Sequence, residues 1–338
     1  MTRTPNRRAP IRRGPPRWQV ALLVVAVAGL SGFTAVRTNA LGAADRLDRM
    51  VDRVSLFIDP PPDRPTVETV VVTPRPSPTA VATPDAVAGG PDLEGPGELG
   101  SRRPAATPTP APVRSPVRVE LVQDYDAVFA TQITNDDCAV AGTQMVLTIL
   151  GLGNTSDAFQ QEIKSRIGEW ESVHDSLNGG WGPGAVAQAL AAYGATGYEP
   201  RAYASYRDAL RDSAIAISTL GKPVVMFPWW GAHTWVMTGY QADADPTLFT
   251  DATVTGAYIL DPWYPRVSSI WGPSDLPGNF ETLAELERNW PVFQGPPGHV
   301  SIGPGWSRPE GAYPERDGRF VVLLPTTPLA STGSGAGS

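Results

Sequence analysis

The stretch QITNDDCAVAGTQMVLTIL, residues 132–150, contains the start of a helix around which a domain can pack. Asp136 or Asp137 is suited to cap a helix that runs from Cys138 to about Leu150. The residues after the cap are apolar on nearly every side, which is typical of a helix buried all round. We therefore expect a central buried helix with the only cysteine of the chain at its first position.

Cys138 gains a chemical property from that position. Unsatisfied backbone N–H groups and the helix dipole favour an anion at a helix N-terminus. A thiol placed there is more readily a thiolate, which is the nucleophilic form of cysteine. The alternative is an inert apolar cysteine in the core. A single cysteine excludes both a disulfide framework and a Cys-rich zinc site, and we expect no metal or organic cofactor.

A nucleophilic thiol needs a base, and the chain has three histidines. His174 follows an acidic stretch and is interpreted as a surface residue. His299 lies in a Pro/Gly-rich loop. His233 begins the strand-like segment HTWVMTGY and is the candidate base. The alternative for His233 is an ordinary hydrogen-bonded residue at a strand end.

Asp261 is the candidate orienting group for His233. If the strands on either side of residues 241–256 pair antiparallel, Asp261 falls near Trp235 and its carboxylate comes close to the imidazole. A carboxylate there holds the ring in one tautomer and stabilises its cation. The alternative is that Asp261 only begins a turn before a proline. Gln132 precedes the cysteine and could donate to an oxyanion, although a lone glutamine is weak support.

The tryptophans supply candidate walls for a cleft. Trp229, Trp230 and Trp235 flank His233 in sequence, and Trp181 and Trp263 could reach the same place. Aromatic walls suit a bound peptide or glycan. The alternative for each residue is packing in the core or at its rim. Substrate binding is assigned to Trp181, Trp229, Trp230 and Trp235.

Helices precede strands along the domain, an order typical of an α+β fold. Further helices are expected near residues 157–170, 183–193 and 206–219. Strands are expected at residues 223–227, 233–240, 257–263 and 319–324, which are rich in β-branched and aromatic residues.

The N-terminal part predicts export. Residues 1–17 carry six arginines and no acid, and residues 18–36 are uncharged and about as long as one membrane span. Arginines on that side predict a single-pass anchor in the cell membrane with a cytoplasmic N-terminus and an extracellular domain. The alternative is a signal peptide cut after Ala40 or Ala43, which would give a secreted protein.

Four further segments follow the apolar run. Residues 37–58 are expected to form a juxtamembrane amphipathic helix, and residues 59–116 a disordered Pro/Thr-rich linker. Such a linker is extended and could hold a domain more than about 100 Å from the bilayer. Residues 117–325 are assigned to the globular domain and residues 326–338 to a disordered tail. The oligomeric state stays open.

Charge excludes one class of partner. The net charge is −7, and the six N-terminal arginines make the remainder more acidic still. An acidic domain is a poor candidate for binding nucleic acid, because that affinity depends on Lys and Arg contacts to phosphate.

Several of these segments together resemble the family-39 cysteine peptidases and their stand-alone relatives, which are papain-like enzymes known for processing double-glycine leader peptides. The resemblance covers nearly all of residues 120–325, in the order 132–138, 182–194, 221–225, 231–240, 260–262 and 280–290. It implies a papain-like fold, with a helical half carrying the nucleophile and an antiparallel sheet half. It further implies Cys138 as nucleophile, His233 as base, Asp261 as orienting residue and Gln132 in the oxyanion hole.

Two features depart from that family. Ala139-Val140 follow the cysteine where the family often has Gly-Pro, which leaves the chemistry intact. The chain also lacks the transporter ATPase domain that accompanies leader-peptide processing, so the substrate stays open.

Three functions are therefore carried forward. The first is a tethered extracellular cysteine peptidase that hydrolyses amide bonds in a peptide or protein substrate. The second is a catalytically inactive papain-like module that binds wall peptides or a partner protein. The third is a hydrolase of peptidoglycan cross-link peptides.

Overall fold

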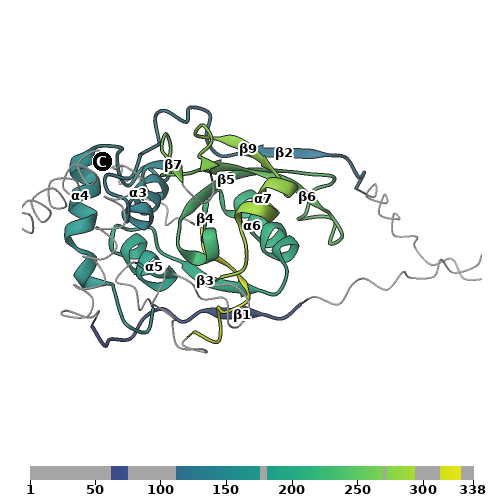
Figure 1. Ribbon diagram of the computed structural model, residues 1–338. Coiled ribbons are helices and arrows are strands. Elements are labelled where there is room, and N and C mark those ends of the chain that lie inside the picture. Colours follow the sequence, from purple (N-terminus) through teal and green to yellow (C-terminus); the bar gives the residue numbers. More distant parts are fainter. Residues whose placement is uncertain (1–61, 75–111, 176–180, 269–271, 294–312, 329–338) are drawn as a thin grey trace, which may run out of the picture. The chain divides into compact units, whose positions relative to one another are not determined.

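The computed structural model describes residues 62–74, 112–175, 181–268, 272–293 and 313–328 (Figure 1). The expected cytoplasmic tail (1–17), anchor (18–36) and amphipathic helix (37–58) lie outside these residues, as does His299. Within the described ranges, no helix has both the length and the apolar character that crossing a membrane requires.

The described residues form a mixed α+β structure, as expected. Five α-helices are present among them, which are α3 (Cys138–Ile149), α4 (Asp157–Ser165), α5 (Pro183–Ala192), α6 (Tyr206–Leu220) and α7 (Leu283–Asn289). The large sheet has eight strands, which are β1 (Val70–Val72), β2 (Val117–Glu120), β3 (Tyr198–Tyr203), β4 (Val224–Met226), β5 (Trp235–Ala242), β6 (Val254–Leu260), β9 (Asn279–Thr282) and β10 (Phe320–Pro325). A separate two-stranded ribbon is formed by β7 (Val267–Ser268) and β8 (Gly272–Pro273).

The sheet is antiparallel except at one edge. Its order is β1-β3-β10-β4-β5-β6-β9, and only β1 and β3 pair in parallel among the described strands. Strand β5 is long enough to pair with β4 along one half and with β2 along the other. The hairpin of β5 and β6 therefore lies in the interior of the sheet, with β4 and β2 on one side and β9 on the other.

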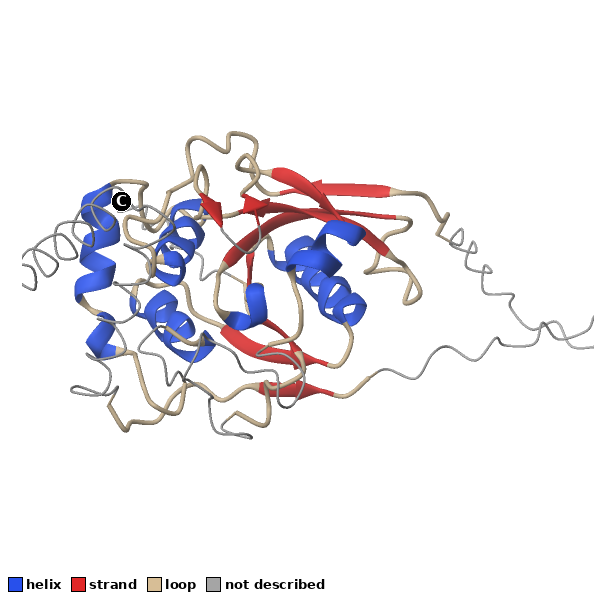
Figure 2. Ribbon diagram, in the orientation of Figure 1, coloured by secondary structure: helices blue, strands red, loops and turns tan. Residues whose placement is uncertain are grey.

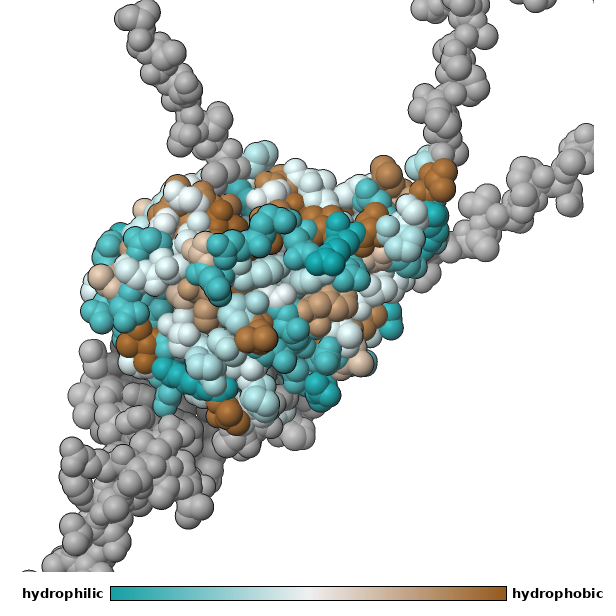
Figure 3. All heavy atoms as spheres, turned by 90° about the horizontal axis from the view of Figure 1, so that it is seen from above, coloured by the Kyte–Doolittle hydropathy of each residue, from teal (hydrophilic) through white to brown (hydrophobic). Residues whose placement is uncertain are grey.

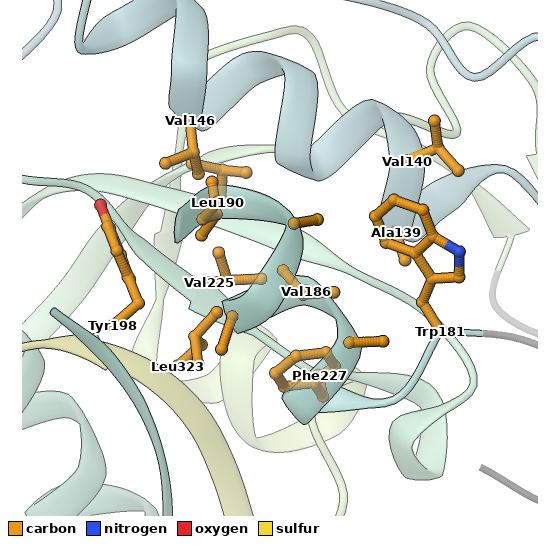
Figure 4. Close-up of a cluster of buried hydrophobic side chains, with 14 of the residues drawn as sticks. Ala139, Val140, Val146, Trp181, Val186, Leu190, Tyr198, Val225, Phe227 and Leu323 are labelled. Atoms are coloured by element: carbon orange, nitrogen blue, oxygen red, sulfur yellow. The ribbon is translucent and has the colours of Figure 1, made fainter. Parts of the chain in front are cut away.

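Helices cover both faces of the sheet (Figure 2). Helices α3, α4 and α5 share one core cluster with sheet residues such as Val225 and Val236. Helices α6 and α7 share a second cluster with Met226 and Met237, on the opposite face. Neighbouring residues of one strand enter different clusters because side chains alternate across a strand. Figure 4 shows the first cluster, in which α3 and α5 pack against the sheet.

The linker expected at residues 59–116 is partly wrong. Residues 62–74 are part of the folded domain: Val70, Val71 and Val72 form β1 and pair with Arg201, Ala202 and Tyr203 of β3. Backbone hydrogen bonding to an existing sheet edge gives this short strand an ordered place despite the prolines around it.

The segment before β1 is also tied down. The carbonyl of Pro62 accepts a hydrogen bond from the N–H of Val173 at 3.0 Å, and Arg64 donates to the carbonyl of Glu169 at 2.7 Å. Residues 62–74 are therefore docked on the domain rather than part of a spacer.

The C-terminal boundary differs by a few residues from the expectation. Strand β10 ends at Pro325, the expected limit of the domain. However, Thr326 donates its backbone N–H to the carbonyl of Gly197 at 2.7 Å, so the chain keeps its contact with the domain just beyond the strand.

The surface of the domain is mixed in character. The face seen in Figure 3 carries separate apolar patches interrupted by hydrophilic residues. Large apolar side chains that are well exposed include Val267 and Leu276, in and after the small ribbon. Scattered exposed apolar residues are normal on a soluble surface and do not by themselves define an interface.

Candidate active site

Cys138 is the first residue of α3 and is partly exposed, whereas the nine residues after it are buried. Asp137 does not cap the helix with its side chain. Its carboxylate instead lies 2.6 Å from the Lys164 ammonium and accepts a hydrogen bond from the N–H of Thr134. The first turn of α3 therefore presents its N–H groups beside the sulfur, where they favour a negative charge.

The antiparallel pairing expected between the two central strands is confirmed. Val236 of β5 lies opposite Leu260 of β6, so the residues at the ends of these strands are neighbours. The ring Nε2 of His233 lies 2.6 Å from Oδ1 of Asp261. Both side chains are buried, at 2% and 9% exposure. The same carboxylate oxygen also accepts the N–H of Trp263 at 2.8 Å, which fixes its orientation.

His233 is held as a cation. Burial alone would lower its pKa, but the carboxylate of Asp261 and the sulfur of Cys138, with which the ring also interacts, raise this pKa to about 9. At neutral pH the imidazole is therefore protonated. Because Nε2 is engaged by Asp261, Nδ1 is the ring nitrogen that remains for the sulfur.

Helix α3 reaches the histidine because Gly142 lets it approach the sheet closely. A Cβ on Gly142 would lie only 2.6 Å from Cγ2 of Thr234, the residue next to His233. Gly142 is one helical turn after Cys138, so this close contact sets the distance between the sulfur and the ring. Sequence reasoning missed Gly142, and the only available signal was a glycine inside an otherwise apolar helix.

An indole packs flat on the imidazole. The ring centroids of Trp229 and His233 are 4.0 Å apart with an interplanar angle of 16°. Trp263 meets the same imidazole edge-on, with centroids 6.4 Å apart. A flat aromatic face stabilises a cation, so this stack favours the charged ring.

Trp229, whose indole stacks on the imidazole, lies in an unusual turn. Trp229 and Trp230 have φ angles of 55° and 60°, in the left-handed region that non-glycine residues rarely adopt. Such residues cost of order 1–3 kcal/mol each and tend to cluster at functional sites. The strain is consistent with a turn kept for the placement of its side chains beside His233.

Gln132 is near the site but is only partly available as an oxyanion donor. Its side chain is fully buried, and Nε2 donates to the carbonyl of Thr134 at 2.7 Å. One of the two N–H bonds of the amide is therefore already used. Its backbone N–H donates to the carbonyl of Pro262 at 3.0 Å, which ties this segment to the residue after Asp261.

Two residues that sequence reasoning missed hold the segment before the cysteine. Gln160 of α4 accepts the N–H of Ile133 at 2.8 Å and donates to the carbonyl of Thr131 at 3.1 Å. Arg266 donates to the carbonyls of Gln132 and Ile133. A glutamine and an arginine far away in sequence gave no signal that could have linked them to this loop.

The four tryptophans assigned to substrate binding are in different places. Trp181 is buried in the core beside α3 rather than in an open cleft, whereas Trp235 is buried in the core on the other face of the sheet and lines a small hollow beside Asp261. Trp229 packs on the histidine, and Trp230 is 41% exposed next to it. Only Trp230 therefore presents a large aromatic surface to solvent near the site.

His174 is a surface residue, as expected. Its ring lies 2.6 Å from the carboxylate of Asp63, and both side chains are well exposed. It makes its pair with the segment before β1 rather than with any residue of the candidate site.

No family model matches the chain, and neither a curated protein nor a solved structure matches it.

Proposed function

We propose that this protein is a cysteine peptidase that hydrolyses amide bonds with Cys138, His233 and Asp261. The observation that carries the proposal is the buried imidazole of His233, which is hydrogen-bonded to a buried carboxylate on one nitrogen and interacts with the only thiol of the chain. A thiol, an imidazole and an orienting acid in this relation form the constellation used in acyl transfer.

The first half of the reaction forms an acyl-enzyme. The Cys138 thiolate attacks the carbonyl carbon of the substrate, and the carbonyl oxygen becomes an oxyanion. N–H groups at the start of α3 and the remaining N–H of the Gln132 amide would stabilise that charge. The His233 imidazolium then gives its proton to the leaving nitrogen, the C–N bond breaks, and a thioester to Cys138 remains.

The second half releases the product. His233, now neutral, takes a proton from a water molecule that attacks the thioester carbonyl. The C–S bond breaks, the acid leaves, and the thiolate–imidazolium pair is restored. Asp261 keeps the ring oriented through both halves and stabilises its cation without itself taking the proton.

We further propose that the domain is papain-like, with α3 as the nucleophile helix and the β5–β6 hairpin as the carrier of histidine and aspartate. The α+β composition and the antiparallel centre of the sheet support this assignment. Tethering through residues 18–36, with the domain outside the cell, belongs to the same proposal and rests on the sequence pattern alone.

The test uses the full-length protein and a thiol-directed electrophile. The wild type should be alkylated faster than free cysteine at neutral pH, because its sulfur lies at a helix N-terminus beside the His233 imidazole, and it should cleave members of a peptide library. Cys138→Ala should abolish both signals. His233→Asn should slow alkylation strongly while leaving the thiol in place.

Peptide cleavage that survives in Cys138→Ala would rule out the mechanism. A wild-type thiol that reacts no faster than free cysteine would favour the inactive binding module instead. Release of peptides from purified cell-wall material, but not from the library, would shift the substrate to peptidoglycan cross-links.

A further inference from the structure

A small hollow lies directly beside the histidine–aspartate pair. It has a volume of about 30 Å³, and its walls include Trp229, Trp235, Asp261, Asp275 and Glu281. Two of these residues touch the imidazole: Trp229 stacks on it and Asp261 is hydrogen-bonded to it. Only one side chain therefore separates the hollow from His233, the residue that donates a proton to the leaving nitrogen.

Glu281 is an unexpected residue at the inner wall of this hollow. It lies on β9 opposite Ala257 of β6 and is only 4% exposed. Its Oε2 has no hydrogen-bond partner among the described residues. An unpaired carboxylate oxygen in such a place is costly unless a donor or a positive charge arrives.

A second carboxyl group faces Glu281. Burial and the neighbouring Asp275 raise the pKa of Glu281 to about 8, Glu285 of α7 adds to this, and the side chain of Asn279 acts in the opposite direction. Asp275 itself is exposed, at the outer side of the hollow. Both acids line the hollow, and the raised pKa of Glu281 means that a proton, or a cation in its place, is favoured at this carboxyl group.

The size and chemistry of the hollow favour one kind of cation. A divalent metal needs more protein ligands, and no group of three or more His, Cys, Asp or Glu side chains suited to a metal occurs in the described part of the chain. A guanidinium presents a planar fork of five donors that suits a bidentate pairing with a carboxylate, whereas Glu281 offers one unpaired oxygen. A primary ammonium is compact, offers three donors, and is about the size of one or two waters.

We propose that this hollow is a subsite for a primary ammonium group of the substrate, on the leaving-group side of the scissile bond. The assignment rests on the proposed function, because only hydrolysis at Cys138 defines that side. The ammonium enters past Asp275 and donates to Glu281. Its arrival displaces the proton of Glu281 to solvent, so the ammonium meets an ionised Glu281 carboxylate.

The ammonium comes from a lysine-like side chain of the leaving fragment. The α-nitrogen of that fragment is the scissile amide nitrogen until the C–N bond breaks, so the fragment carries no free amino terminus in the substrate. Norleucine in place of lysine removes the ammonium and keeps an apolar side chain of similar length.

The first experiment measures binding without catalysis. Full-length Cys138→Ala protein is titrated with n-butylammonium while tryptophan fluorescence is recorded, since Trp229 and Trp235 line the hollow. We expect a saturable change that weakens at least about tenfold in Glu281→Gln and that n-butanol does not produce. Glu287→Gln, an exposed glutamate on α7, is the matched control and should bind like the parent.

Asp275→Asn provides a second variant at an exposed position, where folding is not at risk. It should weaken n-butylammonium binding in the same direction. Equal binding in the parent, Glu281→Gln and Asp275→Asn, or no saturable binding in any of them, would overturn the subsite.

The second experiment uses turnover with active protein. Peptides with lysine, norleucine or acetyl-lysine after the scissile bond are compared, and the preference for the charged group should appear in KM and vanish in Glu281→Gln. Ammonium binding in the first experiment without any Cys138-dependent cleavage would contradict the proposed function and leave the binding of the ammonium in place. Cleavage with no preference for the charged peptides would contradict the subsite and leave the proposed peptidase function in place.

Discussion

Two histidine–aspartate pairs in this molecule have the same spacing and opposite surroundings. In each pair a ring nitrogen lies 2.6 Å from a carboxylate oxygen. His233 and Asp261 are buried at the end of the central hairpin, at 2% and 9% side-chain exposure. His174 and Asp63 are on the surface, at 60% and 83% exposure. The distance is shared, so any difference in behaviour must come from what surrounds each pair.

Burial changes what the carboxylate does to the imidazole. In water, charge–charge attraction at this distance is small and is screened further by salt. Away from water the same attraction is much stronger, and for His233 it outweighs the cost of burying the ring. The buried pair also has an indole stacked on it and a sulfur beside it, neither of which is found at His174. The buried pair therefore combines an oriented imidazole with a neighbouring thiol, which the exposed pair lacks.

The largest expected effect separates the two histidines. His233→Asn should reduce kcat/KM for peptide cleavage by about 10³–10⁴-fold, because both proton transfers lose their carrier. His174→Asn is the matched substitution at the exposed pair and should leave kcat/KM unchanged. Steady-state kinetics on both variants, with circular dichroism to verify folding, make the comparison. A loss in the His174 variant, or less than a tenfold loss in the His233 variant, would contradict the assignment.

The next effect concerns the acid of the buried pair and has a pH signature. The wild type needs the imidazolium, whose pKa is about 9, so activity should hold at neutral pH and fall as pH rises through about 9. Asp261→Asn removes the charge that raises this pKa and leaves burial, which lowers it. The alkaline decline should therefore begin at lower pH, and kcat/KM at pH 7 should drop by about 10²-fold.

Profiles of kcat/KM between pH 5 and 10 test this expectation. Asp63→Asn, at the exposed pair, serves as the control and should keep the wild-type profile. An alkaline limb that stays in place in Asp261→Asn would mean that another group sets it.

A smaller effect tests whether the close packing of α3 on β5 places the Cys138 sulfur beside His233. Gly142→Ala places a methyl group 2.6 Å from Thr234, so α3 must move away from β5 by a fraction of an ångström. We expect a roughly tenfold lower kcat/KM and a loss of about 1–3 kcal/mol in the free energy of unfolding. Gly168→Ala is the control, because a Cβ there meets nothing within 4 Å. Equal behaviour of the two variants would show that the close approach of α3 has no bearing on the site.

The sequence predicted those parts of the molecule whose cause is local. Helix α3 was predictable because its apolar residues and preceding aspartates are contiguous, and the structure places it at Cys138–Ile149. The meeting of His233 and Asp261 was predictable because antiparallel pairing of consecutive strands brings the start of the first strand beside the end of the second. In both cases the information lies within one continuous segment of the chain.

The sequence did not predict features that depend on distant partners. Strand β1 was hidden by the prolines around it, and its partner β3 contains Pro200, which disfavours a strand assignment. Trp181 was assigned to a cleft because the sequence does not tell which indoles are buried beneath the helices. The hollow beside Asp261 rests on Glu281, a single glutamate whose burial depends on the packing of β9 against β6.

The smallest effect completes the comparison at the exposed pair. A double-mutant cycle with His174→Gln and Asp63→Asn measures how much the two side chains stabilise each other. Because both are largely in water, the coupling should be at the limit of detection in the urea midpoint at physiological salt and should vanish at high salt. The backbone bond from Val173 to Pro62 remains in every variant, so the segment before β1 should stay docked. A strong, salt-independent coupling would mean that this pair is shielded from water after all, and spacing would then matter more than burial in setting what a histidine–aspartate pair can do.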